Sequence, residues 1–152
     1  MNKKISVENF NPDWKNWFQS LHATIWPAVQ PWALSVEHVG STSVAGLAAK
    51  PIIDIDIIVK DVKSLAPVIL ALEKIGYIHR GNLGIEGREA FRIPSTSSIK
   101  HNLYVCIQDC LALRNHLILR NFLNENEQAR NEYGKLKTRL AESVLSIDEY
   151  VE

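Results

Sequence analysis

Apolar residues recur every three or four positions in two stretches of the chain, and this spacing predicts amphipathic helices. The first stretch follows Asn11, Pro12 and Asp13, residues that suit the start of a helix, and we expect Pro27 and Pro31 to end or bend it. Its apolar face consists of Trp14, Trp17, Phe18, Leu21 and Ile25. The second stretch covers residues 65–75, after the capping residue Ser64 and before Gly76.

Runs of β-branched residues between and after these helices predict strands. Residues 52–59, with the sequence Ile-Ile-Asp-Ile-Asp-Ile-Ile-Val, have the strongest strand pattern. The other expected strands cover residues 35–39, 77–80, 88–93 and 99–107, and helices are expected over 109–124 and 127–143. This order predicts an α/β (α+β) fold, a mixed β-sheet flanked by helices with a helical C-terminal part. Because no repeat or linker divides the sequence, we expect a single domain spanning residues 1–152.

Composition and charge narrow the classes of protein. Of the 152 residues 46% are hydrophobic, enough for a substantial core and too many for a disordered chain. The 17 Lys and Arg residues balance the 17 Asp and Glu residues, so the formal net charge is zero. Nucleic-acid-binding proteins usually carry a basic excess, and the balance therefore argues against a nucleic-acid partner.

The sequence also indicates where the protein works. The longest purely apolar run, residues 65–72, is far shorter than the roughly 18 residues that a membrane-spanning helix needs. The first nine residues contain no apolar signal segment, so we expect a cytoplasmic protein. Cys106 is expected to be a small buried residue, and its spacing from Cys110 and the histidines matches no zinc pattern.

Two aspartates in the strongest strand carry the candidate chemistry. Because side chains alternate along a strand, Asp54 and Asp56 share one face and Ile53, Ile55 and Ile57 share the other. Neighbouring carboxylates repel each other unless a cation lies between them, and Mg²⁺ binds to one or two carboxylates together with substrate phosphates. The alternative is an exposed sheet face with two solvated aspartates.

A Gly-Ser turn upstream of the aspartates favours a bound cation over two solvated aspartates. Gly40 and Ser41 follow the apolar strand residue Val39, and such a turn offers backbone N–H groups and a hydroxyl to phosphate oxygens. No Gly-Lys-Ser/Thr follows, which excludes a P-loop kinase. A hydrophobic residue, Gly-Ser, a loop and Asp-x-Asp on the next strand together resemble the signature of the nucleotidyltransferase superfamily.

Longer blocks resemble one family in particular. Residues 38–55 (HVGSTSVAGLAAKPIIDI) look like the hallmark block of the GrpB family, an uncharacterised nucleotidyltransferase-like group. A second block that is similar to that family includes residues 101–105, 113–123 and 132–137. The resemblance implies a nucleotidyltransferase-like fold in which Gly40, Ser41, Thr42 and Ser43 hold the phosphates of an NTP and Asp54 and Asp56 bind Mg²⁺.

The chain departs from the pattern of active members of the superfamily. These usually add a third carboxylate from a later strand, but residues 100–107 contain no Asp or Glu and begin with His101 and Asn102. Ala45 replaces a proline that is usual in the family, and the chain ends at Glu152, where relatives tend to continue into a further helix. One metal ion remains compatible with these residues, whereas a two-metal mechanism is in doubt.

These observations lead to a hypothesis with a named alternative. The protein transfers an NMP from an NTP to a small-molecule or protein acceptor, with Asp54 and Asp56 binding Mg²⁺. The alternative is a catalytically inactive nucleotide-binding module that lacks the third carboxylate. The sequence defines neither the base of the NTP nor the acceptor.

Several further side chains have a functional and a structural interpretation. Lys50 contacts phosphate or forms a surface salt bridge, and His101 is a general base or a structural histidine. Arg88 and Arg92 share one strand face and hold pyrophosphate or an acidic acceptor, or are simply solvated. Glu37 is the nearest acid that could replace the missing carboxylate. For Arg114, His116 and Arg120 a solvated helix face is favoured over an acceptor site.

Overall fold

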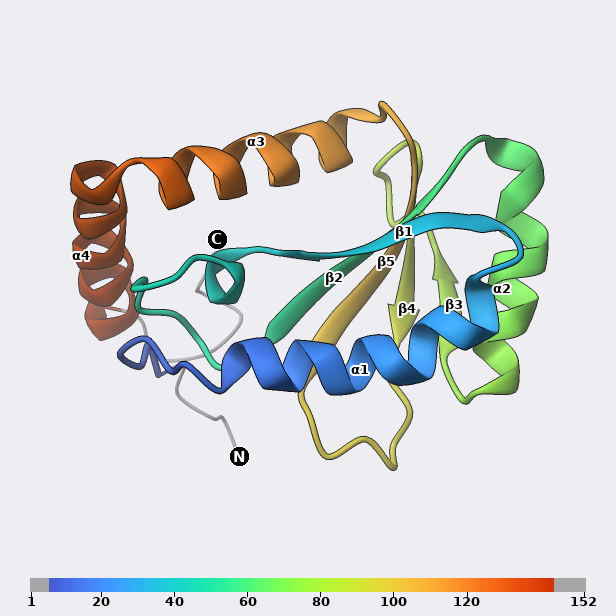
Figure 1. Ribbon diagram of the computed structural model, residues 1–152, viewed down its shortest axis with the longest axis horizontal. Coiled ribbons are helices and arrows are strands. Elements are labelled where there is room, and N and C mark those ends of the chain that lie inside the picture. The colour runs from blue at the N-terminus through green and yellow to red at the C-terminus, as the bar shows by residue number, and fades with distance from the viewer. Residues whose placement is uncertain (1–5, 144–152) are drawn as a thin grey trace.

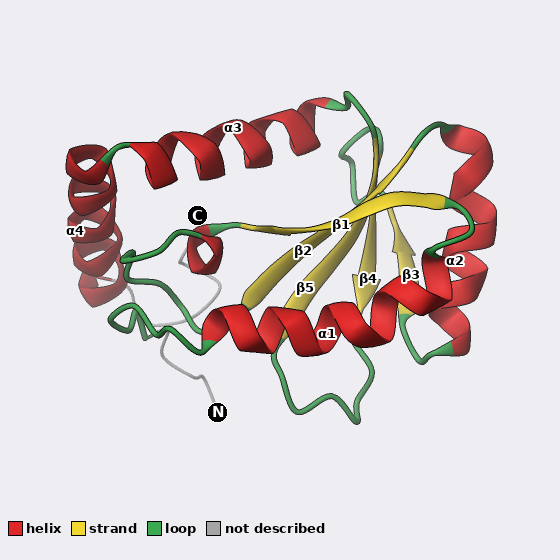
Figure 2. Cartoon of the chain, viewed as in Figure 1, coloured by secondary structure: helices red, strands yellow, loops and turns green. Residues whose placement is uncertain are grey.

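A five-stranded sheet lies at the centre of the protein, with helices on both of its faces (Figures 1 and 2). The computed structural model describes residues 6–143. Its helices are α1 (Trp14–Val29), α2 (Leu65–Lys74), α3 (Leu111–Glu125) and α4 (Glu127–Ser143). Its strands are β1 (Ala33–Val39), β2 (Ile53–Val59), β3 (Ile78–Gly81), β4 (Arg88–Arg92) and β5 (His101–Ile107). Two short 3₁₀ turns, Ser41–Ser43 and Val62–Ser64, precede β2 and α2.

The predicted α/β fold class is therefore confirmed, with small shifts at the ends of elements. The strand expected over 99–107 begins at His101, and the helix expected from residue 109 begins at Leu111. Pro27 does not end α1, because the helix continues to Val29 and the N–H of Gln30 still donates to the carbonyl of Trp26. The expectation for the chain end at Glu152 concerns residues outside those described.

The strands are arranged in the order β1-β2-β5-β4-β3. Strand β2 pairs in parallel with β5, and the other neighbours are antiparallel, so the sheet is mixed as expected. On one face of the sheet, Asp54 lies between Val39 of β1 and Asn102 of β5, and Asp56 lies between Glu37 and Tyr104. This face is covered by α3, and we call it the α3 face.

The opposite face carries the main hydrophobic core. Ile53, Ile55 and Ile57 are fully buried there against α1 and α2, together with Trp14 and Leu72. Burying a side chain of this size contributes about 1.5–3 kcal/mol, which makes this face the principal stabilising layer. The strand is thus anchored by its isoleucines, and its aspartates are held rigidly on the α3 face.

Two further expectations concern the cysteines and the absence of a membrane-spanning helix. Cys106 is buried and Cys110 is half-buried, and both are free thiols. Within residues 6–143 no helix combines the length and the apolar composition needed to cross a membrane.

Candidate functional site

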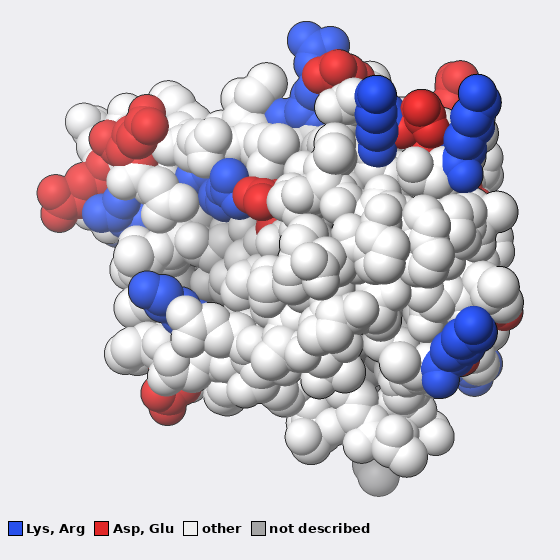
Figure 3. Space-filling view, turned by 45° about the vertical axis from the view of Figure 1, so that its right-hand side comes forward, with Lys and Arg blue, Asp and Glu red and all other residues white. Residues whose placement is uncertain are grey.

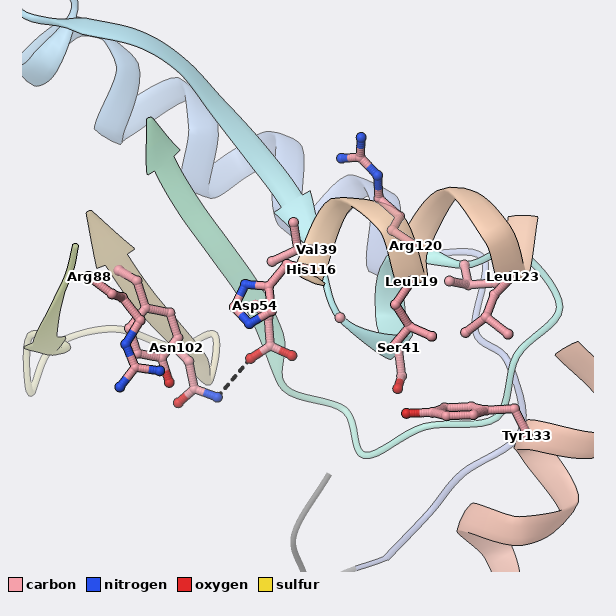
Figure 4. A pocket seen from close by; sticks show the side chains of 13 residues that line it. Val39, Ser41, Asp54, Arg88, Asn102, His116, Leu119, Arg120, Leu123 and Tyr133 are labelled. Atoms are coloured by element: carbon pink, nitrogen blue, oxygen red, sulfur yellow. Dashed lines mark hydrogen bonds between the residues drawn. The ribbon is translucent and has the colours of Figure 1, made fainter. Parts of the chain in front are cut away.

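A cavity of about 280 Å³ lies between the α3 face of the sheet and α3 itself (Figure 4). Its walls come from the ends of β1 and β2, from β4 and β5, and from α3 and α4. The polar side chains that line it are Ser41, Asp54, Arg88, Asn102, Tyr104, His116, Arg120 and Tyr133. Val39, Gly40, Val44, Leu119 and Leu123 complete it. The segments that meet here are far apart in the sequence, and of the two aspartates of β2 Asp54 lines the cavity, whereas Asp56 is fully buried and is not among the lining residues.

The turn after β1 presses directly against the first carboxylate. Gly40 has φ +73°, a left-handed conformation that favours glycine, and a Cβ atom there would lie 2.2 Å from Oδ2 of Asp54. Glycine is therefore required twice, for its backbone conformation and for the close approach of the carboxylate. Local geometry thus places Asp54 directly against the turn that carries Ser41.

Only part of the predicted Gly-Ser-Thr-Ser phosphate site faces this cavity. Ser41 is buried, lines the cavity and accepts a hydrogen bond from Nζ of Lys137. Thr42 instead hydrogen-bonds through Oγ1 to Nε2 of His38 at 2.9 Å, and the hydroxyl of Ser43 donates to the carbonyl of Gly40 at 2.5 Å. Thr42 and Ser43 therefore stabilise the turn and are not among the lining residues, and their contact with the nucleotide stays a prediction.

The two aspartates have different surroundings. Asp54 is half-buried, lines the cavity and accepts a hydrogen bond from Nδ2 of Asn102 at 2.8 Å (Figure 4). Asp56 is fully buried, and its Oδ2 lies 2.6 Å from Nδ1 of His116. The other oxygen, Oδ1, has no hydrogen-bond partner among the described residues, although it is buried. A buried carboxylate oxygen without a partner is costly and is suited to a cation.

His116 links α3 to the sheet. The hydrogen bond to Asp56 raises the pKa of His116, while partial burial opposes this effect. Arg120, one turn further along α3, donates to Oε1 of Glu37 and to the carbonyl of His38, both at 3.1 Å. The preferred interpretation of His116 and Arg120 as solvated residues is therefore wrong: the polar side of α3 packs onto the aspartate face. Arg114 is exposed, as expected.

The edge of the cavity formed by β4 and β5 is basic and aromatic. Cζ of Arg88 lies 4.4 Å from the centroid of the Tyr104 ring, within the range of a cation–π contact. Burial raises the pKa of Tyr104, and the charge of Arg88 opposes that rise. Figure 4 shows Arg88 beside Asn102, at the opposite side of Asp54 from Ser41.

Besides Thr42, Ser43 and the fully buried Asp56, three further predicted site residues do not line this cavity. His101 pairs with Ile53 on the core face, where its ring bonds to the hydroxyl of Tyr77 at 2.8 Å and to the carbonyl of Ile99 at 2.7 Å. Its role beside the aspartates is therefore corrected to the structural alternative. Lys50 is half-buried and Arg92 is exposed, and neither lines the cavity.

The residues present fit a cation that arrives with its own oxygen ligands. Within the described part of the chain, no group of three or more His, Cys, Asp and Glu side chains is arranged to hold a metal. Asp54 and Asp56 nevertheless share one face, and Oδ1 of Asp56 is buried without a partner. Two carboxylates together with phosphate oxygens form a ligand set that Mg²⁺ accepts.

Lys137 and Tyr133 of α4 are the residues that sequence reasoning did not assign. Lys137 is only 3% exposed, although lysine is rarely buried, and its ammonium lies 5.8 Å from the centroid of the Tyr133 ring. Tyr133 lines the cavity with its hydroxyl near Ser41 (Figure 4). The sequence feature that could have identified both residues is the C-terminal block of residues 132–137, which resembles the GrpB family.

The stability of this arrangement should depend on pH through His38. Burial, aided by Arg120, lowers the pKa of His38 to about 4, from a usual value of 6.5. Burial also lowers the pKa of His101. Below pH 6.5 the unfolded chain therefore binds protons that the folded chain does not bind. We expect the free energy of unfolding to fall as the pH drops from 6.5 towards 4.

Urea denaturation at several pH values between 7.5 and 4.5 would measure this fall. In His38→Gln the slope should be shallower than in the wild type, and the matched histidine control His22→Gln should follow the wild type. Equal slopes for His38→Gln and the wild type would contradict the assignment.

Comparison with solved structures defines the fold class of the protein. Cid1 poly(U) polymerase, solved with MgGTP bound, aligns with 80% of this chain and 41% of its own at a TM-score of 0.56 and 14% identity. A cytoplasmic RNA terminal U-transferase aligns with 82% of this chain and 39% of its own, at a TM-score of 0.57 and 14% identity. At this identity the likeness shows the fold alone, and the fold is nucleotidyltransferase-like.

Within that class the chain belongs to the GrpB family, because the family model described as GrpB protein matches residues 4–152. The crystal structure of the conserved protein GrpB from Enterococcus faecalis aligns at a TM-score of 0.83 and 34% identity, over 96% of this chain and 89% of that one. UPF0157 protein BH1888 of Halalkalibacterium halodurans is 36% identical, over 93% of this chain and 71% of its own length. UPF0157 protein YqkA of Bacillus subtilis is 28% identical, and this chain spans 44% of it.

Proposed function

We propose that this chain is a Mg²⁺-dependent nucleotidyltransferase that moves an NMP from an NTP to a small-molecule or protein acceptor. One observation carries the proposal: the Gly40–Ser41 turn lies against the carboxylate of Asp54, with the buried ammonium of Lys137 on the Ser41 hydroxyl. A hydroxyl, a cation and a carboxylate at one end of a cavity suit a triphosphate accompanied by its metal ion.

In this proposal each side chain has a defined task. Ser41 and Lys137 bind the terminal phosphates, and the ring of Tyr133 offers a stacking surface for the base. Asp54 and Asp56 would hold Mg²⁺, which supplies charge neutralisation at the phosphate oxygens when bound. Asn102 and His116 fix the orientation of the two carboxylates through their hydrogen bonds. The chain thereby contributes mainly positioning and electrostatic stabilisation, the effects on which phosphoryl transfer depends.

Charge supports a small-molecule or protein acceptor over a nucleic acid. The formal net charge is zero. On the face shown in Figure 3, positive and negative side chains are interspersed around a broad uncharged area. A backbone of phosphates is usually met by an extended positive surface, and this face provides none.

The alternative function is nucleotide binding without catalysis. It is favoured by β5, which contains no Asp or Glu and presents Asn102 next to Asp54. Both functions require Mg²⁺-dependent nucleotide binding. Release of pyrophosphate from the bound NTP in the presence of low-molecular-weight acceptors would separate them, because a binding module releases none.

The first test is calorimetric titration of ATP, CTP, GTP and UTP into the protein, with and without Mg²⁺. We expect one NTP to bind tightly only with Mg²⁺, and we expect Asp54→Asn to abolish that binding because the substitution removes a charged ligand. Asp13→Asn makes the same chemical change at an exposed position before α1 and serves as the control. If none of the four NTPs binds, or if Asp54→Asn binds as the wild type does, the proposal is wrong.

A further inference from the structure

The cavity contains a guanidinium that no carboxylate neutralises within the described residues. Arg88 lines the cavity from β4 and is not part of any ion pair found between residues 6 and 143. Its Nε is buried and lacks a hydrogen-bond partner there. The ring of Tyr104 supports the guanidinium from one side at 4.4 Å. A half-buried guanidinium without a carboxylate partner is stabilised by an anion.

Strand β5 supplies no carboxylate beside the two aspartates that could remove a proton from an acceptor. Strand β5 places Asn102 beside Asp54 and Tyr104 beside Asp56, where an acid would be needed. Each carboxylate named on this face already has one polar partner. Asp54 accepts from Asn102, Asp56 pairs with His116, and Glu37 pairs with Arg120.

We infer that the acceptor is an oxyanion, a carboxylate or a phosphate group, which binds to Arg88 at the β4–β5 edge of the cavity. The transfer step of this inference rests on the proposed nucleotidyltransferase function. An oxygen of the oxyanion attacks the α-phosphorus of the NTP, the bond from that phosphorus to the bridging oxygen of the β-phosphate breaks, and pyrophosphate leaves with the electron pair. The product is a mixed anhydride if the oxyanion is a carboxylate and a phosphoanhydride if it is a phosphate, and in neither case does a proton have to be removed from the attacking oxygen.

Acid–base chemistry favours such an acceptor at this site. A hydroxyl has a pKa close to that of water, about 16, and needs a base before it can attack. A carboxylic acid has a pKa of about 4 and is already ionised at neutral pH. For an active enzyme, the guanidinium of Arg88 in the cavity and the absence of an acid on β5 both suit a nucleophile that arrives as an anion.

The anion site can be tested without the nucleotide. We would titrate acetate, inorganic phosphate and glycerol, at constant ionic strength, into ¹⁵N-labelled protein and follow the Nε–H signal of Arg88 and the side-chain amide of Asn102 by NMR. Acetate represents a carboxylate source, phosphate a phosphoryl source, and glycerol an uncharged hydroxyl. The matched variants are Arg88→Gln and Arg92→Gln, which lie on the same strand and the same face.

We expect at least one anion to shift both signals and glycerol to shift neither, and the anion that binds more tightly identifies the acceptor group. Arg88→Gln should weaken that binding by about tenfold or more, as expected for loss of a charge-assisted hydrogen bond, whereas Arg92→Gln should not change it. The wild-type Nε–H shift reports on Arg88 even if Arg88→Gln fails to fold.

Three results would overturn the inference: neither anion shifts the signals, glycerol shifts them equally, or the two variants behave alike. The proposed function fails separately, through the absence of Mg²⁺-dependent NTP binding. If an anion shifts the NMR signals but no NTP binds, the anion site at Arg88 is supported and only the transfer step is wrong.

Discussion

Gly40→Ala is expected to abolish Mg²⁺-dependent NTP binding and to lower the free energy of unfolding by several kcal/mol. The new Cβ would lie 2.2 Å from Oδ2 of Asp54, so either the turn or the carboxylate must move. A left-handed conformation at a residue other than glycine costs about 1–3 kcal/mol, and overpacking costs about 1–3 kcal/mol more. Calorimetric titration and urea denaturation of the same preparation would measure both effects.

Gly84→Ala separates the two causes. Gly84 has φ +83°, close to that of Gly40, but a Cβ atom there meets nothing within 4 Å. We expect this control to lose only the conformational part, about 1–3 kcal/mol, and to bind nucleotide as the wild type does. If Gly40→Ala were no more destabilised than Gly84→Ala and still bound nucleotide, the close contact between the turn and Asp54 would contribute neither to stability nor to nucleotide binding.

The sequence pattern was sufficient for the parts of the site that are local. The alternation of β2 predicts which face carries Asp54 and Asp56, and the Gly-Ser turn is recognisable from its own residues. Both predictions depend only on neighbouring positions in the chain, because strand periodicity determines the face of a side chain and glycine permits the turn conformation.

The parts that sequence analysis missed depend on contacts between distant segments. His116 reaches Asp56 across 60 residues, and Lys137 reaches Ser41 across 96. On their own helices these residues have the pattern of a solvated face, because helical periodicity does not reveal that a polar side will pack onto a sheet of carboxylates. Burial of Lys137 likewise follows from the packing of α4 against the turn and not from its neighbours in sequence.

His101 shows a different limit. Its position at the start of a strand, where active members of the superfamily usually carry a third carboxylate, left both a role beside the aspartates and a structural role open. The parallel register instead pairs His101 with Ile53 and Asn102 with Asp54. A shift of one residue in register moves a side chain to the other face, and nothing in the sequence of a single strand fixes its register against a partner.

His116→Ala is expected to destabilise the fold by about 2–3 kcal/mol, because it leaves the buried carboxylate of Asp56 without its hydrogen-bonding partner. Breaking a buried ion pair by removing one partner costs about 3–5 kcal/mol, and the smaller figure allows for the partial exposure of His116. The side chain of His116 is 34% exposed, whereas that of Asp56 is fully buried. Urea denaturation would measure the loss.

Two further variants test whether this cost belongs to the pair. Arg114→Ala removes an exposed side chain from the same helix and should change the stability by no more than about 0.5 kcal/mol. In a double-mutant cycle, Asp56→Asn should make the loss of His116 much less costly, since a neutral amide needs no charged partner. Additive effects would mean that His116 and Asp56 contribute independently. A coupling of about 1 kcal/mol or more, within the range of about 0.5–3 kcal/mol for contacting residues, would show that α3 is held on the sheet through the same carboxylate that we assign to the metal ion. Nucleotide binding and the packing of α3 against the sheet would then depend on one another.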